Sequence, residues 1–355
     1  MELLVRNAWY VACWDYTLAE TGMFATTIAN EPIVIYRGET GRLIALEDRC
    51  CHRAAPLSLG RREGDDLRCM YHGLKFAPDG KCIEIPGQDR IPVHACVRSY
   101  AVAEKHSWIW VWLGNPADAD EALIPPATSL DDPSVMLKSG QIDYDANYLL
   151  INDNLLDFSH LTYVHANTFG NSAQWAQKRP TIINLDRGVR VQRWLKDELP
   201  PRASGDMQYE RVDRWSSYDF LIPGILLMDS GVYPPGTADA SNDGPPREDI
   251  AALQANRTCQ AVTPLTDGTS RYLFSYGPTA ATGDEALLNR MFETAKAAFG
   301  EDKAMIEAQQ RTLAINPQVK MMPVSADAAL SRFRWLMGRL MKAEMPEPAA
   351  TVAAE

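Results

Sequence analysis

Residues 50–72 read CCHRAAPLSLGRREGDDLRCMYH and contain two Cys/His pairs, Cys50-x-His52 and Cys69-x₂-His72. Sixteen residues separate the pairs, which places each pair on a loop of its own. A Cys₂His₂ zinc finger instead groups cysteine with cysteine and histidine with histidine, and a helix carries its histidines. Because each loop here offers one thiolate and one imidazole, the pattern favours another kind of metal centre. A structural zinc site remains the alternative.

Two thiolates on one iron and two imidazoles on the other are the ligands of a Rieske [2Fe–2S] cluster. The split pairs therefore predict such a cluster, held by Cys50, His52, Cys69 and His72. Neutral imidazole ligands raise the reduction potential above that of clusters held by four cysteines. Cys51 adds a thiol beside the first pair, and its role stays open.

Short β-type segments surround these loops. Three runs of aliphatic, β-branched and aromatic residues, broken by Gly and Asp, predict strands at residues 32–37, 42–48 and 107–114. Residues 115–133 are rich in Pro, Asp and Ala and have no periodic apolar face, which is typical of a connector. We therefore expect an all-β cluster domain at residues 1–115 and a second domain at residues 116–355.

The second domain mixes helical and strand-like patterns, which predicts an α+β fold. Residues 143–165 have apolar residues at helical spacing behind Asp and Asn start signals and predict one helix. Strands are expected at 181–194, 212–222 and 258–276, and further helices at 283–299, 301–314 and 325–343. Residues 234–249 have the Gly, Pro and Asp content of a mobile loop.

Residues 152–165, NDNLLDFSHLTYVH, contain a second candidate metal site. Asn154, Asp157 and His160 are spaced at i, i+3 and would share one face of the predicted helix. His165 follows five residues later, so a bulge or the helix end must turn its imidazole toward the first. Two histidines and one carboxylate form the facial triad of non-haem Fe(II) oxygenases. An ordinary solvated helix face is the alternative.

The third ligand of such a triad must come from elsewhere in the chain. Residues 298–310, AFGEDKAMIEAQQ, offer three carboxylates, Glu301, Asp302 and Glu307. Spacing alone does not choose among them.

Composition excludes several classes of protein. The 355 residues are 46% hydrophobic and 23% charged, which indicates a globular chain. The net charge of −11 argues against a nucleic-acid binder, because such proteins need a basic face. Apolar runs are too short for a signal peptide or a membrane span, so a cytoplasmic location is expected. The seven cysteines are odd in number and clustered, which favours metal over disulfides.

The order of these motifs resembles that of Rieske non-haem iron oxygenases. Cys-x-His and Cys-x₂-His are followed about eighty residues later by Asn-x₂-Asp-x₂-His-x₄-His, and then by EDK at residues 301–303. The opening RNAWYVA, residues 6–12, is most similar to the oxygenase components of vanillate and dicamba O-demethylases. The resemblance implies a Rieske domain followed by a catalytic domain of antiparallel sheet and helices. It also implies a mononuclear Fe(II) held by His160, His165 and Asp302.

The resemblance further implies partner proteins. The chain has neither a G-x-G-x-x-G dinucleotide fingerprint nor a plant-type C-x₄-C-x₂-C run. We therefore expect electrons from a separate NAD(P)H-dependent reductase with flavin and a ferredoxin-type cluster. The family also implies a head-to-tail homotrimer, in which Asp157 bridges His72 of one chain to His160 of the next. Asn154 would lie near the iron in an undefined role.

By this resemblance the chain is a terminal oxygenase that uses O₂ to hydroxylate an aromatic substrate. The expected reaction is O-demethylation or ether cleavage of an aryl ether acid with release of an aldehyde. Aromatic-ring cis-dihydroxylation of the phenoxybenzoate type and N-dealkylation are the alternatives. A Rieske electron carrier without catalysis is excluded, because it would need only the first ~115 residues and no His/His/Asp site.

The sequence says less about how a substrate is bound. Residues 220–232 are mostly apolar and are expected to line a pocket for an aromatic compound. Demethylase relatives often have a histidine for the substrate carboxylate or phenol where this chain has Gln260. Arg257 and Arg271 are candidates to supply the missing positive charge, although each is more typical of a surface arginine.

Overall fold

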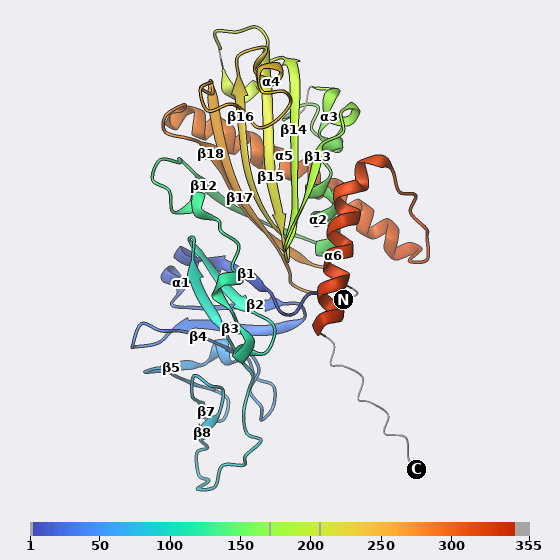
Figure 1. Ribbon diagram of the computed structural model, residues 1–355. Helices are drawn as coiled ribbons and strands as arrows, with labels where there is room; N and C mark the ends of the chain where they lie inside the picture. Colours follow the sequence, from blue (N-terminus) through green and yellow to red (C-terminus); the bar gives the residue numbers. More distant parts are fainter. Residues whose placement is uncertain (1–2, 170–171, 206, 345–355) are drawn as a thin grey trace, which may run out of the picture.

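The computed structural model describes residues 3–169, 172–205 and 207–344. A β-rich N-terminal part packs against a larger part that is built on one antiparallel sheet (Figure 1). Within these ranges no helix has the length and apolar character needed to cross a membrane. The α+β prediction is confirmed.

Three small antiparallel sheets form the N-terminal part, with strand orders β1-β11-β10, β2-β3-β4-β9 and β5-β6-β7-β8. Their strands are β1 (Trp9–Trp14), β2 (Met23–Ile28), β3 (Glu31–Arg37), β4 (Leu43–Glu47), β5 (Arg61–Glu63), β6 (Asp66–Arg68), β7 (Lys75–Phe76), β8 (Cys82–Glu84), β9 (Ser99–Tyr100), β10 (Val102–Lys105) and β11 (Trp108–Trp112). The expected strands are confirmed as β3, β4 and β11. The paired strands β1 and β11 are buried along their whole length, which explains their aromatic sequences WYVACW and WIWVW.

A seven-stranded antiparallel sheet with the order β12-β18-β17-β16-β15-β14-β13 forms the second part of the described chain. Its strands are β12 (Lys138–Tyr144), β13 (Thr181–Leu185), β14 (Gly188–Glu198), β15 (Val212–Leu221), β16 (Ile225–Tyr233), β17 (Gln254–Pro264) and β18 (Ser270–Pro278). The runs expected as single strands at 181–194 and 258–276 are each a hairpin, β13-β14 and β17-β18. The apolar segment 220–232 spans the end of β15 and most of β16.

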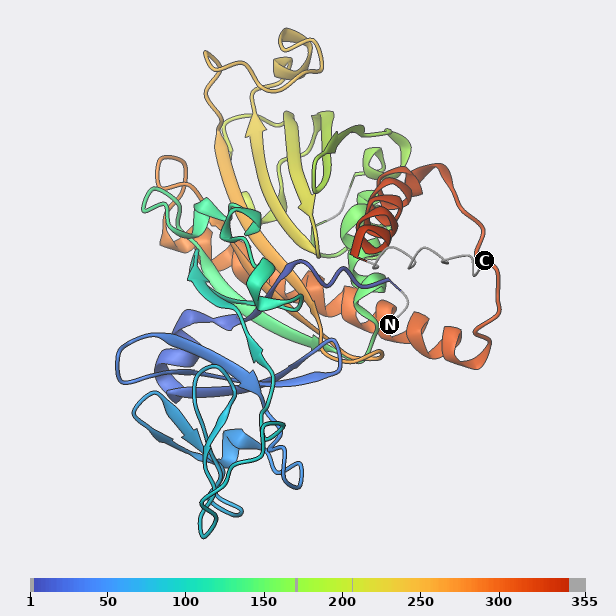
Figure 2. The same cartoon turned by 60° about the horizontal axis from the view of Figure 1, so that its bottom comes forward.

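Helices cover this sheet. The longer ones are α2 (Tyr148–Leu156), α5 (Glu285–Ile315) and α6 (Ala328–Glu344), and α3 (Gln174–Gln177) and α4 (Thr237–Ala240) are short. The short helix α1 (Asp15–Thr21) belongs to the N-terminal part, beside β1 and β2. Figures 1 and 2 show α5 running along one face of the sheet. The two helices expected at 283–299 and 301–314 are this one helix, because Gly300 keeps a helical conformation. The end of α6 meets the start of the chain, where Glu344 accepts from the backbone N–H groups of Arg6 and Asn7.

The single helix expected over residues 143–165 is wrong. β12 takes the first residues, and α2 ends at Leu156. At Asp157 the backbone is extended, with φ −123° and ψ 94°, and the Asp157 carboxylate accepts from the Ser159 N–H at 2.8 Å. This side-chain cap begins a separate 3₁₀ helix, Phe158–Thr162, because aspartate competes with the helix for backbone donors.

The two parts share apolar packing. The buried aromatic residues of β11 belong to the same hydrophobic cluster as Ala261 and Leu273 of the large sheet. The hydroxyl of Thr263 donates to the backbone oxygen of Val11 at 2.6 Å. Between the two parts, the expected connector contains three 3₁₀ turns, Pro116–Asp118, Glu121–Leu123 and Thr128–Leu130. The boundary at residues 115/116 stays a prediction.

Candidate cluster and iron sites

The two Cys/His pairs converge at the ends of loops in the small β5-β8 sheet region. The His52 and His72 rings lie edge to face, with centroids 4.6 Å apart. Cys50 and Cys69 are buried beneath them. Burial raises the pKa of the Cys50 thiol to about 11, and the hydrogen bond with Cys69 adds to this effect. Two adjacent buried thiols and two paired imidazoles match the donor set of a Rieske cluster.

The two loops have the same backbone design. In each, the cysteine N–H donates to the carbonyl oxygen five residues later at 2.8 Å, and the N–H four residues later donates back to the cysteine oxygen at 2.9 Å. The residue at that fourth position has a positive φ in both loops, +55° at Ala54 and +79° at Gly73. A Cβ on Gly73 would lie 2.7 Å from Pro86, so this position requires glycine.

The histidine side of this site faces outward. His52, His72 and Cys51 are exposed, and Tyr71 lies against His72 with centroids 4.0 Å apart. A cluster held by these four residues would have its histidine side at the protein surface and its cysteine side inside.

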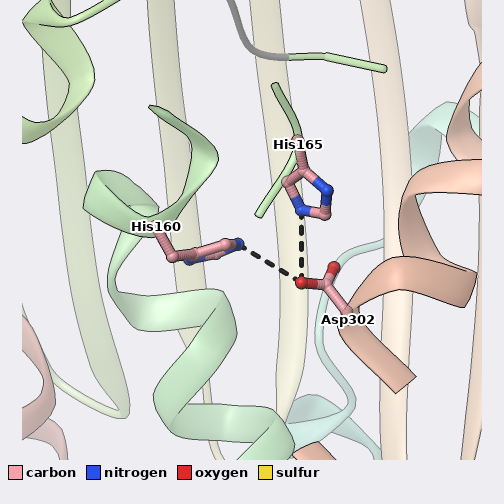
Figure 3. A group of neighbouring side chains, drawn as sticks. All are labelled: His160, His165 and Asp302. Carbon is pink, nitrogen blue, oxygen red and sulfur yellow. Dashed lines mark ion pairs between the residues drawn. The ribbon is translucent and has the colours of Figure 1, made fainter. Parts of the chain in front are cut away.

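His160, His165 and Asp302 form the second group, shown in Figure 3. Their ligand atoms lie within 4.8 Å of one another. The Asp302 Oδ1 atom is 3.2 Å from His165 Nε2 and 3.5 Å from His160 Nε2. Three such donors around one point are the set that a 2-His-1-carboxylate iron site requires.

Hydrogen bonds at the opposite ring nitrogens orient both imidazoles. His160 Nδ1 contacts the backbone oxygen of Asp157 at 2.5 Å, and His165 Nδ1 contacts Glu301 Oε2 at 2.9 Å. With Nδ1 as the donor in each ring, Nε2 is left as a lone-pair donor toward a metal. Burial lowers the pKa of His160, which favours the neutral form that binds a metal.

The structure separates the three carboxylates of α5. Asp302 is buried and meets both imidazoles. Glu301 supports His165 from behind and also accepts from the Thr168 hydroxyl at 2.7 Å. Glu307 faces elsewhere and accepts from the backbone of Asp145 at 2.9 Å. Which of the three carboxylates reaches the histidines depends on the side of α5 that each residue occupies. Sequence spacing alone did not reveal this.

Asn154 and Asp157 also lie beside the triad. The Asn154 amide donates to Asp302 Oδ1 at 3.0 Å and lies 3.4 Å from His160 Nε2. The structure thus places Asn154 within contact of two ligand candidates. Asp157 reaches His160 through its backbone oxygen, while its carboxylate accepts from Ser159.

A cavity of about 140 Å³ opens beside the triad. Cavities of this size admit one benzene ring. Most of its walls are aromatic and aliphatic, and they include Leu155, Phe158, Leu161, Phe169, Trp175, Trp215, Met228, Val232, Tyr276, Met291 and Phe299. The arrangement suits a single-ring aromatic compound held next to a metal site.

Comparison with known proteins identifies the family. Residues 8–101 match the Rieske [2Fe-2S] domain, and residues 144–343, more than half of the chain, match the C-terminal domain of vanillate O-demethylase oxygenase. The chain is a Rieske non-haem iron oxygenase. This oxygenase is 43% identical over 347 residues to the iron-sulfur subunit of the toluene-4-sulfonate monooxygenase system of Comamonas testosteroni. The matched region covers 96% of this chain and 98% of that protein.

Two further relatives support the family. The vanillate O-demethylase oxygenase subunit of Pseudomonas sp. strain HR199 is 33% identical, with 98% of both chains covered. The crystal structure of dicamba monooxygenase bound to dicamba has a TM-score of 0.81 and 30% identity, and covers 96% of this chain and 99% of that one. The oxygenase therefore uses a Rieske [2Fe–2S] cluster and a mononuclear iron. Because its relatives are named oxygenase components or subunits, its electrons come from a separate protein.

The polar groups of the cavity differ from those the sequence suggested. Gln260 does line the cavity of the oxygenase and is 4% exposed, and its Oε1 atom has no partner in the described chain. Arg257 is paired with Asp229 at 2.8 Å and lines no part of this cavity. Arg271 is paired with Asp143 at 3.0 Å and also lies outside it.

Two arginines that the sequence analysis missed do line the cavity, Arg202 and Arg214. Arg202 is exposed and donates to the backbone oxygen of Asn167 at 3.0 Å, whereas Arg214 lies in β15. A signal was present in the sequence VDRWSSYDFL of β15, in which residues alternate between the two faces of the sheet. Arg214 and Ser216 share one parity, but Trp215, which has the other parity, also lines the cavity of the oxygenase. The alternation alone does not say which face meets the cavity.

Proposed function

We propose that this oxygenase hydroxylates a methyl or methoxy carbon attached to a single aromatic ring. One oxygen atom of O₂ enters the new C–OH group, and the other leaves as water with two electrons and two protons from outside. A hydroxylated methoxy carbon is a hemiacetal, which collapses to a phenol and formaldehyde. The observation that carries the proposal is the His160/His165/Asp302 group at the edge of a cavity sized for one ring.

We assign the ligands as follows. The cluster is held by Cys50, His52, Cys69 and His72, and the iron by His160, His165 and Asp302. When bound, the cluster supplies single electrons and the iron supplies open positions for O₂. Asn154 orients Asp302 through its 3.0 Å hydrogen bond. Phe169 and Phe299 screen the group from water, since both line the cavity beside it.

The oxygenase would work as a homotrimer whose electron path between chains runs through Asp157. The Asp157 backbone oxygen already contacts His160 Nδ1, and its carboxylate oxygens each keep a second lone pair beyond the bonds to Ser159. We propose that this carboxylate accepts from His72 of a neighbouring copy. The electron donor would be an NAD(P)H-dependent reductase with flavin and a ferredoxin-type cluster, in the cytoplasm.

Incubation with a compatible reductase, NADH and O₂ tests the reaction. The panel contains methyl-, methoxy- and phenoxy-substituted benzoates and benzenesulfonates. Benzyl alcohols or formaldehyde are the expected products. A ring diol would replace the proposal with cis-dihydroxylation.

N-Dealkylation is the second candidate, because the chloroacetanilide N-alkylformylase oxygenase component of Rhizorhabdus wittichii is 29% identical over 88% of this chain. An N-alkyl anilide belongs in the panel for that reason. Turnover of that compound alone would favour the second candidate over the first.

A further inference from the structure

Arg214 is a cation in the wall of the substrate cavity. It lies in the middle strands of the sheet and lines the same cavity as His160, His165 and Asp302. Its Nη1 atom is inaccessible to solvent and has no hydrogen-bond partner in the described ranges. Within those ranges Glu198 acts on Arg214 electrostatically, but the two form no ion pair. The Arg214 side chain as a whole is half-buried, but a guanidinium nitrogen that is shielded from water without an acceptor is costly, because its desolvation is not offset.

The neighbours of Arg214 do not supply the missing acceptor. Glu198 is the nearby carboxylate that favours the charged guanidinium, but its Oε1 atom accepts from the Ser172 hydroxyl at 2.5 Å and from Gln174 instead. The Trp175 ring lies near two guanidinium groups, with its centroid 5.9 Å from the Arg214 Cζ atom and 5.2 Å from the Arg193 Cζ atom. Arg193 donates to the backbone oxygen of Trp175 at 2.8 Å. Glu198 Oε1 is thus bound by uncharged side chains, and Arg214 keeps a cationic group in the cavity wall.

Strand register places further polar groups beside Arg214. Ser216 lies two residues along β15, on the same face. Ser230 is directly opposite Ser216, and Asn256 is directly opposite Ser230. All three line the cavity, so hydroxyl and amide groups continue across the sheet from the guanidinium. This polar edge contrasts with the aromatic walls and has the donors that an oxyanion requires.

We propose that Arg214 binds an anionic substituent, a carboxylate or sulfonate, of the aromatic substrate. The planar guanidinium matches two oxygens of such a group, and the bound anion supplies the acceptor that the fold leaves out. The substituent at this end of the cavity sets which ring carbon meets the His160/His165/Asp302 group. The inference rests on the proposed function and narrows its substrate class to aromatic acids. Arg214 is thus a specificity residue, and Gln260 does not have to carry the charge recognition.

Binding to the oxidised holoenzyme, measured by calorimetry without reductase, tests the inference. The ligands are toluene-4-sulfonate, 4-methylbenzoate and the neutral 4-methylbenzamide, which has nearly the shape of the benzoate. The acids should bind wild-type enzyme about 10- to 100-fold more tightly than the amide. In Arg214→Gln this preference should disappear, and Arg214→Lys should keep part of it. Arg257→Gln, on a residue outside the cavity, is the matched control and should bind as wild type.

The same series excludes a merely structural role. If Arg214 only supports Trp175, its replacement will weaken binding of acid and amide by the same factor, which would overturn the inference. Equal binding of acid and amide to the wild-type enzyme would overturn it without any variant. In turnover, Arg214→Gln should raise KM for the acids with a smaller change in kcat.

Failure of the proposed function has a different signature. If acids bind tightly in an Arg214-dependent way but are never hydroxylated, the proposed reaction is refuted and the role of Arg214 in binding is retained. Hydroxylation of the amide as efficiently as of the benzoate would support the reaction and refute the role of Arg214.

Discussion

Replacing Glu301 with glutamine should weaken iron binding at the triad without affecting the cluster. Glu301 Oε2 lies 2.9 Å from His165 Nδ1 and 2.7 Å from the Thr168 hydroxyl. The His165 side chain is 2% exposed and that of Glu301 is 31% exposed. Solvent therefore reaches the glutamate end of the contact but not the histidine end. Loss of such a supporting partner costs about 10- to 100-fold in metal affinity. Because the glutamine oxygen can still accept from His165, we expect the lower end, about tenfold or ~1.4 kcal/mol.

Titration of the chelator-treated oxygenase with Fe(II), in competition with a coloured chelator, measures this change. The visible absorption of the cluster serves as an internal standard for the amount of intact protein. Glu307→Gln is the matched control, because Glu307 lies on the same helix but accepts from the backbone of Asp145 and pairs with Lys303 at 3.5 Å. Wild-type affinity in Glu301→Gln, or an equal loss in Glu307→Gln, would refute the supporting role.

Three further substitutions test other parts of the account. Asp157→Asn should keep both metal centres, because asparagine caps a helix as well as aspartate. In single-turnover absorption measurements, however, O₂ and substrate should reoxidise its reduced cluster slower by orders of magnitude. Reoxidation at the wild-type rate would contradict the role of Asp157 as a bridge. Gly73→Ala should lower the thermal unfolding midpoint more than Gly87→Ala. Each alanine costs about 1–2 kcal/mol because its φ is positive, but only the alanine at position 73 also clashes with Pro86. Equal midpoints would refute that packing argument. Cys69→Ala should abolish the Rieske-type EPR signal, and a retained signal would exclude Cys69 as a ligand.

The cluster loops could be predicted because their information is local. Each Cys/His pair falls within four residues, and its loop is closed by hydrogen bonds no more than five residues apart. The carboxylate of the triad is different. Asp302 lies 137 residues beyond His165, so only the packing of α5 against the sheet brings the two together. Resemblance to the family supplied Asp302 where spacing left three choices.

Two other features could not be predicted from the sequence, for physical reasons. The helix expected through His165 ends early, because the Asp157 carboxylate satisfies the Ser159 N–H and begins a new turn. This break resolves the loose five-residue spacing of His160 and His165. Arg214 was not singled out from the sequence, because its place in the cavity wall follows from the pairing of β15 with β14 and β16.

Mössbauer spectroscopy of the ⁵⁷Fe-enriched oxygenase and its Asp302→Ala variant tests the ligand assignment most directly. The wild-type protein should show cluster iron and high-spin mononuclear Fe(II) in a ratio of about two to one. Asp302→Ala should lose only the mononuclear component, because Asp302 contacts both imidazoles and none of the cluster residues. A variant that retains the mononuclear iron, or that loses the cluster with it, would contradict the assignment of two separate metal sites in this chain.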